Sequence, residues 1–249
     1  MPRRPRERAE SGYYHVVLKG SGNQILFECE EDHRSFLFYI DEYIARHDIR
    51  LIAWCLMSNH VHLILFDISD RLPDFMHDLA TSYAVRFNKT AGHIGPVFDG
   101  RYHSVRIATD EQLLCALRYV HDNPAKAGVC PAAQYPWSSY GDYLNGDSTR
   151  TYLAPVLDLI GGQGNFKAFS EASEYGGYVF KPGRRVTDDE ALELAQSILG
   201  ADRIPKLKSE KKMERNQALQ ALRSEGLTVK QIERITGIGR SIISRTTRI

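Results

Sequence analysis

The sequence has no long hydrophobic run and few cysteines. None of its apolar stretches approaches the roughly 20 residues of a membrane-spanning helix, and the opening MPRRPRERAE lacks the apolar core of a secretory signal. The cysteines are far apart and include no CxxC pair, which argues against a structural zinc site or a disulfide framework; they are Cys29, Cys55, Cys115 and Cys130. We therefore expect a cytoplasmic protein with reduced thiols and no membrane partner.

Charge is nearly balanced over the chain but unevenly distributed. The 249 residues are 43% hydrophobic, enough for one large domain or for a larger and a smaller one. The formal net charge is +1. From residue 181 onward there are 15 Lys and Arg and 9 Asp and Glu, whereas residues 1–180 contain 17 Lys and Arg and 22 Asp and Glu. The basic C-terminal part favours a polyanionic partner, although basic tails also serve only to keep proteins in solution.

Four apolar or aromatic runs have the pattern of β-strands. They lie at 13–18, 51–57, 60–66 and 102–107. Only Ser58 and Asn59 separate the second run from the third, which is typical of a β-hairpin because asparagine tolerates the left-handed conformation that short turns demand.

Amphipathic spacing predicts three helices between and after these runs. They cover 32–47, 72–88 and 110–122. We expect Asp110 to cap the third helix and Asn123-Pro124 to end it, because proline cannot continue a helix. The order β, α, β, β, α, β, α indicates an α+β fold with an antiparallel sheet and packed helices.

The chain divides into three predicted segments. Residues 1–145 hold the elements above, and a loop-forming composition at 145–150 marks the domain edge. Residues 146–205 form a helical connector with pieces at 152–160, 165–174 and 188–199 but no interpretable motif.

Residues 206–249 have the pattern of a helix-turn-helix. One helix is expected over 216–225, a second over 229–235 after a Thr228 cap, and a third after the glycine-containing turn TGIGR. If that last helix enters a DNA major groove, the side chains facing the bases are those of Ser241, Ser244, Arg245 and Arg248. The alternative is a small helical bundle that mediates self-association.

Two histidines begin the third apolar run. His60 and His62, in the string NHVH, are two residues apart and point to the same face of a strand, near enough to bind one divalent ion. Histidines in a buried strand can equally be hydrogen-bonded core residues, so this pattern alone leaves metal binding open.

Tyr119 and Asn123 share one face of the third predicted helix. They are four residues apart and lie at the edge of its apolar stripe. If the helix packs beside the histidine strand, Asn123 can supply an oxygen as third ligand. Two imidazoles with oxygen ligands suit Mg²⁺ or Mn²⁺, and the ligand types alone leave Zn²⁺ open. The alternative for Tyr119 is an ordinary surface tyrosine.

Several ordered motifs closely resemble those of the REP-associated tyrosine transposases, relatives of the insertion-sequence transposases with a single catalytic tyrosine. The motifs are NHVH at 59–62, GRYHS at 100–104, LRYVHDNPAKAGV at 117–129 and YPWSSY at 135–140. The similarity covers about residues 10–145. It implies a ferredoxin-like domain of the HUH class, which is named after its pair of metal-binding histidines.

The resemblance assigns roles to individual residues. His60 and His62 match the HUH pair, Tyr119 matches the nucleophile, and Asn123 matches the position that completes the metal site. The resemblance also implies that the basic N-terminal segment, which includes Arg3 and Arg4, reads short DNA beside a hairpin.

The implied activity is that of a metal-dependent endonuclease and strand transferase for single-stranded DNA. The reaction would occur near hairpins, through a 5′-phosphotyrosine intermediate, in a monomer or a homodimer. Single-stranded and hairpin DNA are the expected partners, with duplex DNA as a further partner of the C-terminal domain. Basic side chains expected to hold phosphates are those of Arg101, His103, Arg118 and Lys126.

Some alternatives stay open at this stage. Trp137 and Tyr140 can stack on unpaired bases or pack in the core. A replication initiator or relaxase would share the histidine pair but would not explain GRYHS and YPWSSY. A non-catalytic DNA-binding regulator that uses the helix-turn-helix is the rival from a different class.

Overall fold

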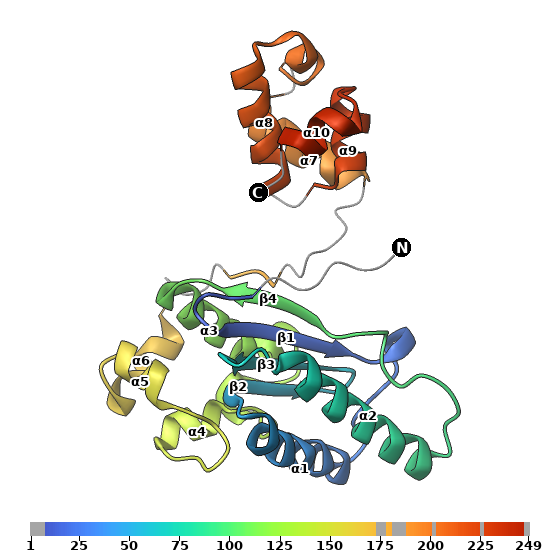
Figure 1. Ribbon diagram of the computed structural model, residues 1–249. Coiled ribbons are helices and arrows are strands. Elements are labelled where there is room, and N and C mark those ends of the chain that lie inside the picture. The colour runs from blue at the N-terminus through green and yellow to red at the C-terminus, as the bar shows by residue number, and fades with distance from the viewer. Residues whose placement is uncertain (1–7, 173–177, 181–187, 201–202, 225–226, 247–249) are drawn as a thin grey trace. The chain divides into compact units, whose positions relative to one another are not determined.

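The computed structural model describes residues 8–172, 178–180, 188–200, 203–224 and 227–246 (Figure 1). The chain forms two compact units, Met1–Pro182 and Gly183–Ile249. Arg3, Arg4 and Arg248, predicted to contact DNA, lie outside the described residues. None of the described helices is long and apolar enough to cross a membrane.

The first unit is built on a four-stranded antiparallel sheet in the order β2-β3-β1-β4. Its strands are β1 (Tyr13–Lys19), β2 (Arg50–Met57), β3 (His60–Phe66) and β4 (His103–Ile107). β1 lies between β3 and β4, so that Val17 is opposite both His62 and His103. The predicted α+β class with an antiparallel sheet is confirmed.

The hairpin between β2 and β3 forms as expected but for a different local reason. Ser58 and Asn59 make the turn, and neither is among the described non-glycine residues with positive φ. The left-handed conformation that we expected is therefore not used. The side chain of Asn59 instead accepts a hydrogen bond from His60.

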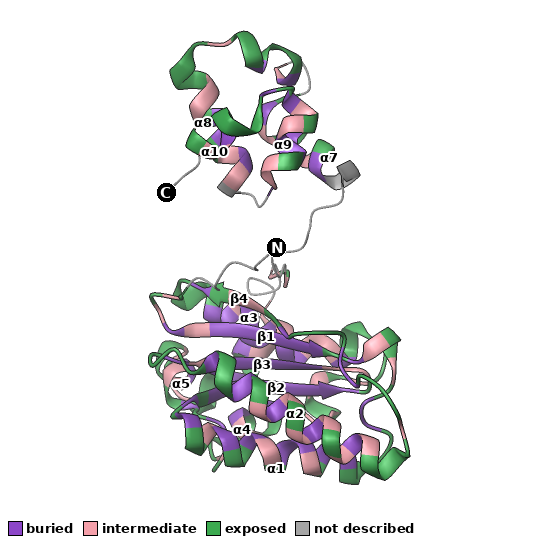
Figure 2. Ribbon diagram, turned by 45° about the vertical axis from the view of Figure 1, so that its right-hand side comes forward, coloured by how far each residue is buried: buried purple, intermediate pink, exposed green. Residues whose placement is uncertain are grey.

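Helices cover both faces of the sheet. α1 (Glu30–His47) and α2 (Leu72–Ala91) pack on one face, and α3 (Asp110–Lys126) packs on the other (Figure 1). Strand side chains alternate between the two cores, and most strand residues are buried (Figure 2). Val16 and Leu63 face α1 and α2, whereas Ala53 and Ile64 face α3.

Both ends of α3 differ from the prediction. Thr109, not Asp110, caps the helix, and its hydroxyl accepts from the backbone N–H of Gln112 at 3.2 Å. Pro124 lies inside the last turn, and the helix continues to Lys126. A proline in the last turn lacks only its own backbone hydrogen bond, so few later bonds of the helix are affected.

The segment after α3 contributes to the core beneath that helix. It contains α4 (Tyr140–Asn145), α5 (Ala154–Leu159) and α6 (Phe166–Glu171). Tyr143, Val156 and Phe166 are fully buried there. The predicted edge at 145–150 thus falls inside the first compact unit, and the functional division into three segments stays a prediction.

The second unit is a small helical body. It contains α7 (Asp188–Leu199), a 3-10 segment at Ile204–Ser209, α8 (Lys212–Ser224), α9 (Val229–Thr236) and α10 (Arg240–Thr246). Thr228 caps α9 in a reciprocal hydrogen-bond pair with Gln231, and Gly237 ends it in the left-handed conformation at φ 67°. Leu219, Ile232 and Ile243 meet in its core.

Candidate active site

The two predicted metal-binding histidines lie on the face of the sheet that α3 covers. Successive residues of β3 point to opposite faces of the sheet, so His60 and His62 point to the same face as Ile64. Ile64 packs in the core that α3 covers. α3 packs on this face through its apolar stripe of Leu113, Ala116, Leu117 and Val120. This packing brings the edge of α3 beside the histidines.

Tyr119 lies next to the histidine pair. The rings of His60 and His62 are 5.0 Å apart between centroids, and the ring of Tyr119 lies edge-on to His62 at 5.6 Å. Tyr119 is half-buried, whereas His62 is buried. The structure therefore brings together three side chains that are predicted to act together.

The end of α3 adds an amide and a cation. Asn123 is half-buried, and its amide nitrogen donates to the backbone carbonyl of Tyr119 at 2.7 Å. This orientation leaves its amide oxygen able to accept or to bind an ion. The ammonium of Lys126 lies 4.3 Å from the centroid of the Tyr119 ring, a cation–π distance.

Hydrogen bonds to Nδ1 orient both histidines. His60 Nδ1 lies 2.7 Å from the amide oxygen of Asn59 and so donates to it, which leaves the lone pair on Nε2. His62 Nδ1 lies 3.0 Å from Nε2 of His15 in β1. His15 Nδ1 in turn lies 3.1 Å from the hydroxyl of Tyr178.

Burial favours neutral imidazoles and a protonated phenol at this site. Burial, together with the nearby Lys19 ammonium, lowers the pKa of His60. Burial and then the charges of His15, His60 and Lys126 lower the pKa of His62 well below its ordinary value. Burial also lowers the pKa of His15 to about 3 and raises the pKa of Tyr119. Neutral imidazoles offer lone pairs to a cation, and the phenol must lose its proton to become a strong nucleophile.

No three His, Cys, Asp or Glu side chains of the described residues form a group suited to a metal. An ion held by His60 and His62 would therefore need an amide oxygen, such as that of Asn123, and ligands from DNA or water. Such a mixed nitrogen and oxygen set suits Mg²⁺ or Mn²⁺.

Three of the four basic residues expected to hold phosphates are exposed to solvent. Arg101 and Lys126 are exposed. His103 is also exposed, and it faces the α3 side of β4 because it is paired with Val17.

Arg118 corrects the fourth prediction. It is buried, with 9% exposure, and donates to the carbonyls of Phe169 and Ala172 at 2.7 Å each. It holds the end of α6 and cannot bind phosphate in this arrangement.

Trp137 and Tyr140, the two residues of YPWSSY considered for base stacking, pack against other side chains. Trp137 stacks on His33 with ring centroids 4.3 Å apart. Tyr140 is buried under α3, and its hydroxyl lies 3.0 Å from that of Ser170. The buried Tyr140 ring is therefore not free to stack on a base, whereas the half-buried Trp137 ring has one face covered by His33.

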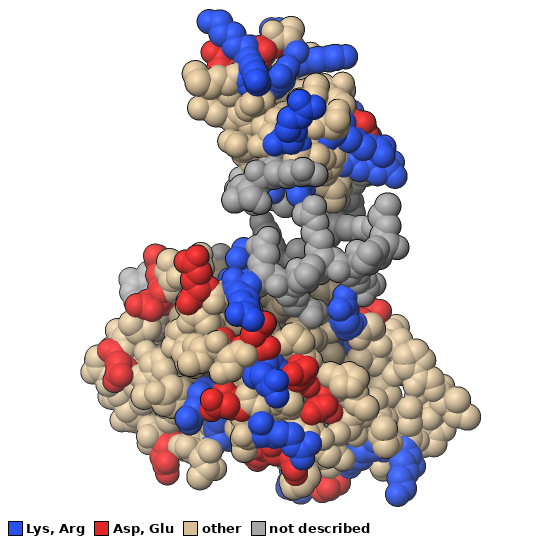
Figure 3. All heavy atoms as spheres, in the orientation of Figure 1, with Lys and Arg blue, Asp and Glu red and all other residues tan. Residues whose placement is uncertain are grey.

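In the second unit, the described residues that were predicted to face DNA lie on α10, and their role in DNA binding stays a prediction. Ser241 and Arg245 of α10 are exposed, and Ser244 is half-buried. On the face drawn in Figure 3, Lys and Arg predominate on this unit, whereas both signs are mixed on the first unit.

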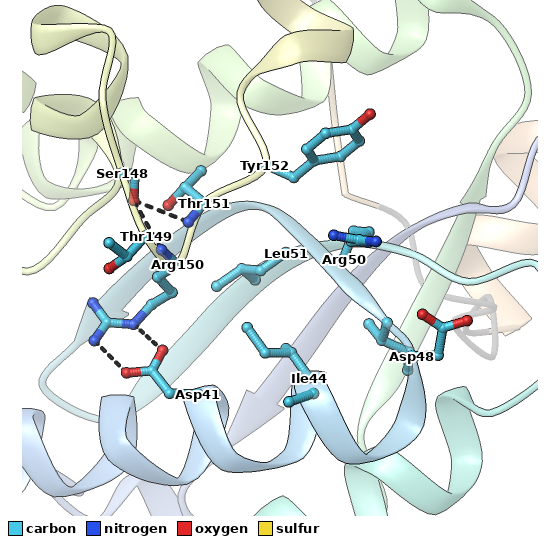
Figure 4. Close-up of a pocket in the computed structure, with 12 residues that line it drawn as sticks. Asp41, Ile44, Asp48, Arg50, Leu51, Ser148, Thr149, Arg150, Thr151 and Tyr152 are labelled. Carbon is cyan, nitrogen blue, oxygen red and sulfur yellow. Dashed lines mark hydrogen bonds and ion pairs between the residues drawn. The ribbon is translucent and has the colours of Figure 1, made fainter.

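A cavity elsewhere in the first unit contains none of these groups. It has a volume of about 730 Å³ and lies between α1 and residues 148–152, at the end of β2 away from the histidine hairpin (Figure 4). Arg150 forms a two-pronged ion pair with Asp41 there, at 2.6 and 2.7 Å. With no histidine or predicted nucleophile in its lining, it is not a candidate for the reaction.

Sequence reasoning missed His15 and Tyr178. A single polar residue inside the apolar run YYHVVL was the available signal for His15. No local signal marks Tyr178, which is 163 residues away from its partner.

Comparison with known proteins agrees with this fold. Residues 8–123 match the family of IS200-like transposases. The solved structure of a REP-associated tyrosine transposase bound to a REP hairpin has a TM-score of 0.50 at 15% identity, over 63% of this chain and 93% of that one. A candidate transposase from Deinococcus radiodurans R1 is 18% identical over 49% of this chain and 97% of that one, with a TM-score of 0.34 that carries no structural argument. No curated protein sequence matches significantly.

Proposed function

We propose that this protein, whose residues 8–123 match the family of IS200-like transposases, cuts and rejoins single-stranded DNA beside hairpins, with Tyr119 as the nucleophile. The observation that carries the proposal is the 5.6 Å approach of the Tyr119 ring to His62, which itself lies 5.0 Å from His60. A phenol beside two neutral imidazoles is the arrangement that the proposed chemistry needs.

His60, His62 and the amide oxygen of Asn123 would hold a divalent ion, Mg²⁺ or Mn²⁺. The neutral state of both imidazoles and the free Nε2 of His60 fit this role. When bound, the ion would polarise the scissile phosphate and neutralise its developing negative charge.

The reaction is a transesterification. The Tyr119 oxygen attacks phosphorus in line, a tyrosyl O–P bond forms, and the bond from phosphorus to the 3′ oxygen breaks. The phenolic proton ends on the leaving 3′ oxygen, which gives a 5′-phosphotyrosine and a free 3′-hydroxyl. Lys126, with its ammonium 4.3 Å from the ring centroid, would stabilise the negative charge that grows on the phenol. Because one phosphodiester replaces another, a 3′-hydroxyl can reverse the step and join strands without ATP.

A single chain contains all of these groups. His60, His62, Tyr119 and Lys126 meet within the first unit, which supports a monomer as sufficient for cleavage even if a homodimer forms. We expect the reaction in the cytoplasm.

Hairpin DNA is the proposed substrate class. The REP-associated transposase of similar fold was solved with a REP hairpin, which supports a hairpin here. Duplex DNA would bind the second unit, where exposed Ser241 and Arg245 of α10 follow the capped α9.

The second candidate function is a non-catalytic regulator that binds duplex DNA through this second unit. The predominance of Lys and Arg on it favours this possibility. The two functions differ in whether a covalent bond to DNA forms.

A covalent-adduct assay tests the proposal. The protein is incubated with Mn²⁺ and end-labelled single-stranded hairpins taken from the DNA that flanks its gene, and denaturing gels report any adduct. We expect an adduct with wild type, none with Tyr119→Phe, and a weak one with His60→Ala. Tyr43→Phe is the matched control, because it removes a hydroxyl that bonds Ser82 on the other face of the sheet. No adduct with wild type on any flanking hairpin would leave the regulator as the better account.

A further inference from the structure

A third imidazole and a second phenol lie behind the histidine pair. His15 is fully buried in β1, and its two ring nitrogens are both occupied, Nε2 by His62 Nδ1 at 3.0 Å and Nδ1 by the Tyr178 hydroxyl at 3.1 Å. Tyr178 lies beyond residues 8–123, the segment that matches the family. The three side chains form one continuous hydrogen-bonded chain.

The direction of this chain decides what His62 can do. A neutral imidazole has one N–H, so each ring donates from one nitrogen and accepts at the other. If Tyr178 accepts from His15 Nδ1, then His15 Nε2 accepts from His62 Nδ1, and the lone pair of His62 stays on Nε2. If the chain runs the other way, His62 Nε2 carries the proton and cannot bind a cation.

Packing holds His15 in the position that this chain needs. The ring of Phe180 lies 4.3 Å from that of His15 between centroids, and the rings of Tyr178 and Tyr119 lie at 5.6 and 5.7 Å. The ring of His15 is therefore enclosed by aromatic neighbours as well as hydrogen-bonded at both ends. His62, in contact with both His15 and Tyr119, transmits this order to the site.

We propose that His15 and Tyr178 are positioning residues that hold His62 with its proton on Nδ1 and its Nε2 lone pair directed to the divalent ion. The inference rests on the proposed function, since it takes His62 as a ligand. Metal-binding histidines generally donate their second ring N–H to a fixed acceptor, and loss of that acceptor weakens metal binding by about 10- to 100-fold. Here the acceptor is a neutral imidazole, and a residue that follows α6 fixes its tautomer.

Mn²⁺ binding to the full chain tests the inference without requiring activity. Titration calorimetry should show about 10- to 100-fold weaker binding for His15→Phe than for wild type. His15→Gln should recover most of the affinity, because an amide can accept from His62 and donate to Tyr178. Tyr178→Phe should lose less than His15→Phe, because it removes only the group that selects the tautomer.

Two variants on the other face of the sheet serve as controls. His47→Phe removes a ring nitrogen that lies 2.8 Å from Asp78 in a buried histidine, and Tyr43→Phe removes a hydroxyl that lies 2.6 Å from Ser82. Both should bind Mn²⁺ as wild type does. A loss of binding in these controls equal to that in His15→Phe would mean that general destabilisation, and not positioning, is the cause, and would overturn the inference.

Nitrogen NMR of the histidine rings reports which ring nitrogen carries the proton, a property that a purely structural role of His15 and Tyr178 would not change. With Mg²⁺ present, His62 should carry its proton on Nδ1 and His15 on Nδ1, and without metal Tyr178→Phe should shift both rings towards a mixture of tautomers. Wild-type His62 protonated on Nε2 in the presence of Mg²⁺ would overturn the inference.

The outcomes separate this inference from the function on which it rests. Wild type that binds no Mn²⁺ would refute the metal site itself. Wild type that binds Mn²⁺ while folded His15→Phe binds it equally well would refute only the role of His15. If His15→Phe does not fold, His15→Gln and Tyr178→Phe decide the matter by the same two measurements.

Discussion

Phe166→Ala tests whether the middle of the chain is part of the core of the first unit. Phe166 is fully buried at the start of α6. Its ring stacks on Tyr143 with centroids 5.2 Å apart and meets Tyr140 edge-on at 5.1 Å. Tyr143 in turn donates to the backbone of Ile52 in β2 at 2.8 Å. The substitution therefore removes the ring that links α6 to the sheet.

The expected loss is large. Replacing a buried phenylalanine with alanine costs about 3–5 kcal/mol, which includes the cavity that is left. With a urea dependence of about 2 kcal/mol per M, the unfolding midpoint of the first unit should fall by about 2 M. The exposed Phe38, at 59% exposure on α1, provides the control, since Phe38→Ala should change stability by less than about 0.5 kcal/mol.

Tryptophan fluorescence in urea measures this loss in the full chain. Both tryptophans, Trp54 and Trp137, belong to the first unit, so the signal excludes unfolding of the second. A midpoint for Phe166→Ala within about 0.3 M of wild type, which at that urea dependence is about 0.6 kcal/mol, would refute the packing described here and would support a separate connector.

Three further results are expected. Arg118→Met should lower the free energy of unfolding by about 2–3 kcal/mol, since two carbonyls lose a charged donor, and should leave the affinity for single-stranded DNA in filter binding unchanged. Lys126→Met should slow adduct formation with little loss of stability. The reverse pattern would contradict both assignments. Arg245→Ala should weaken duplex binding and reduce the salt slope by about one, measured by fluorescence anisotropy at several salt concentrations, and an unchanged slope would argue against α10 as the DNA-facing helix. Burial lowers the pKa of both His15 and His121 to about 3 from an ordinary value of 6.5. Because the unfolded chain binds more protons between these values, the first unit should lose stability as pH falls from about 6.5 towards 3, by up to roughly 1.4 kcal/mol per pH unit for each histidine. His121→Gln should reduce the change in stability between pH 7 and pH 5.5, measured by urea titration. A change as large as that of wild type would contradict this.

Local patterns in the sequence determined the order of the elements and the faces of the key residues. A two-residue spacing on a strand fixes His60 and His62 on one side, and a four-residue spacing on a helix does the same for Tyr119 and Asn123, whatever the rest of the chain does. The errors at the ends of α3 were also local. Thr109, next to Asp110, is also a good helix cap, and Pro124 is tolerated because few later backbone hydrogen bonds of the helix depend on it.

Only the tertiary structure decided which of these faces meet and which polar groups are already engaged. The contact of Tyr119 with His62 requires α3 to cover one particular face of the sheet, and the contact of His15 with His62 requires the register of β1 against β3. Arg118 was expected from the sequence to hold phosphate, yet it is buried and its Nη1 donates to carbonyls 51 and 54 residues away. Periodicity reports which side of an element is apolar, whereas pairing between distant segments is selected by burial and hydrogen bonding over the whole fold.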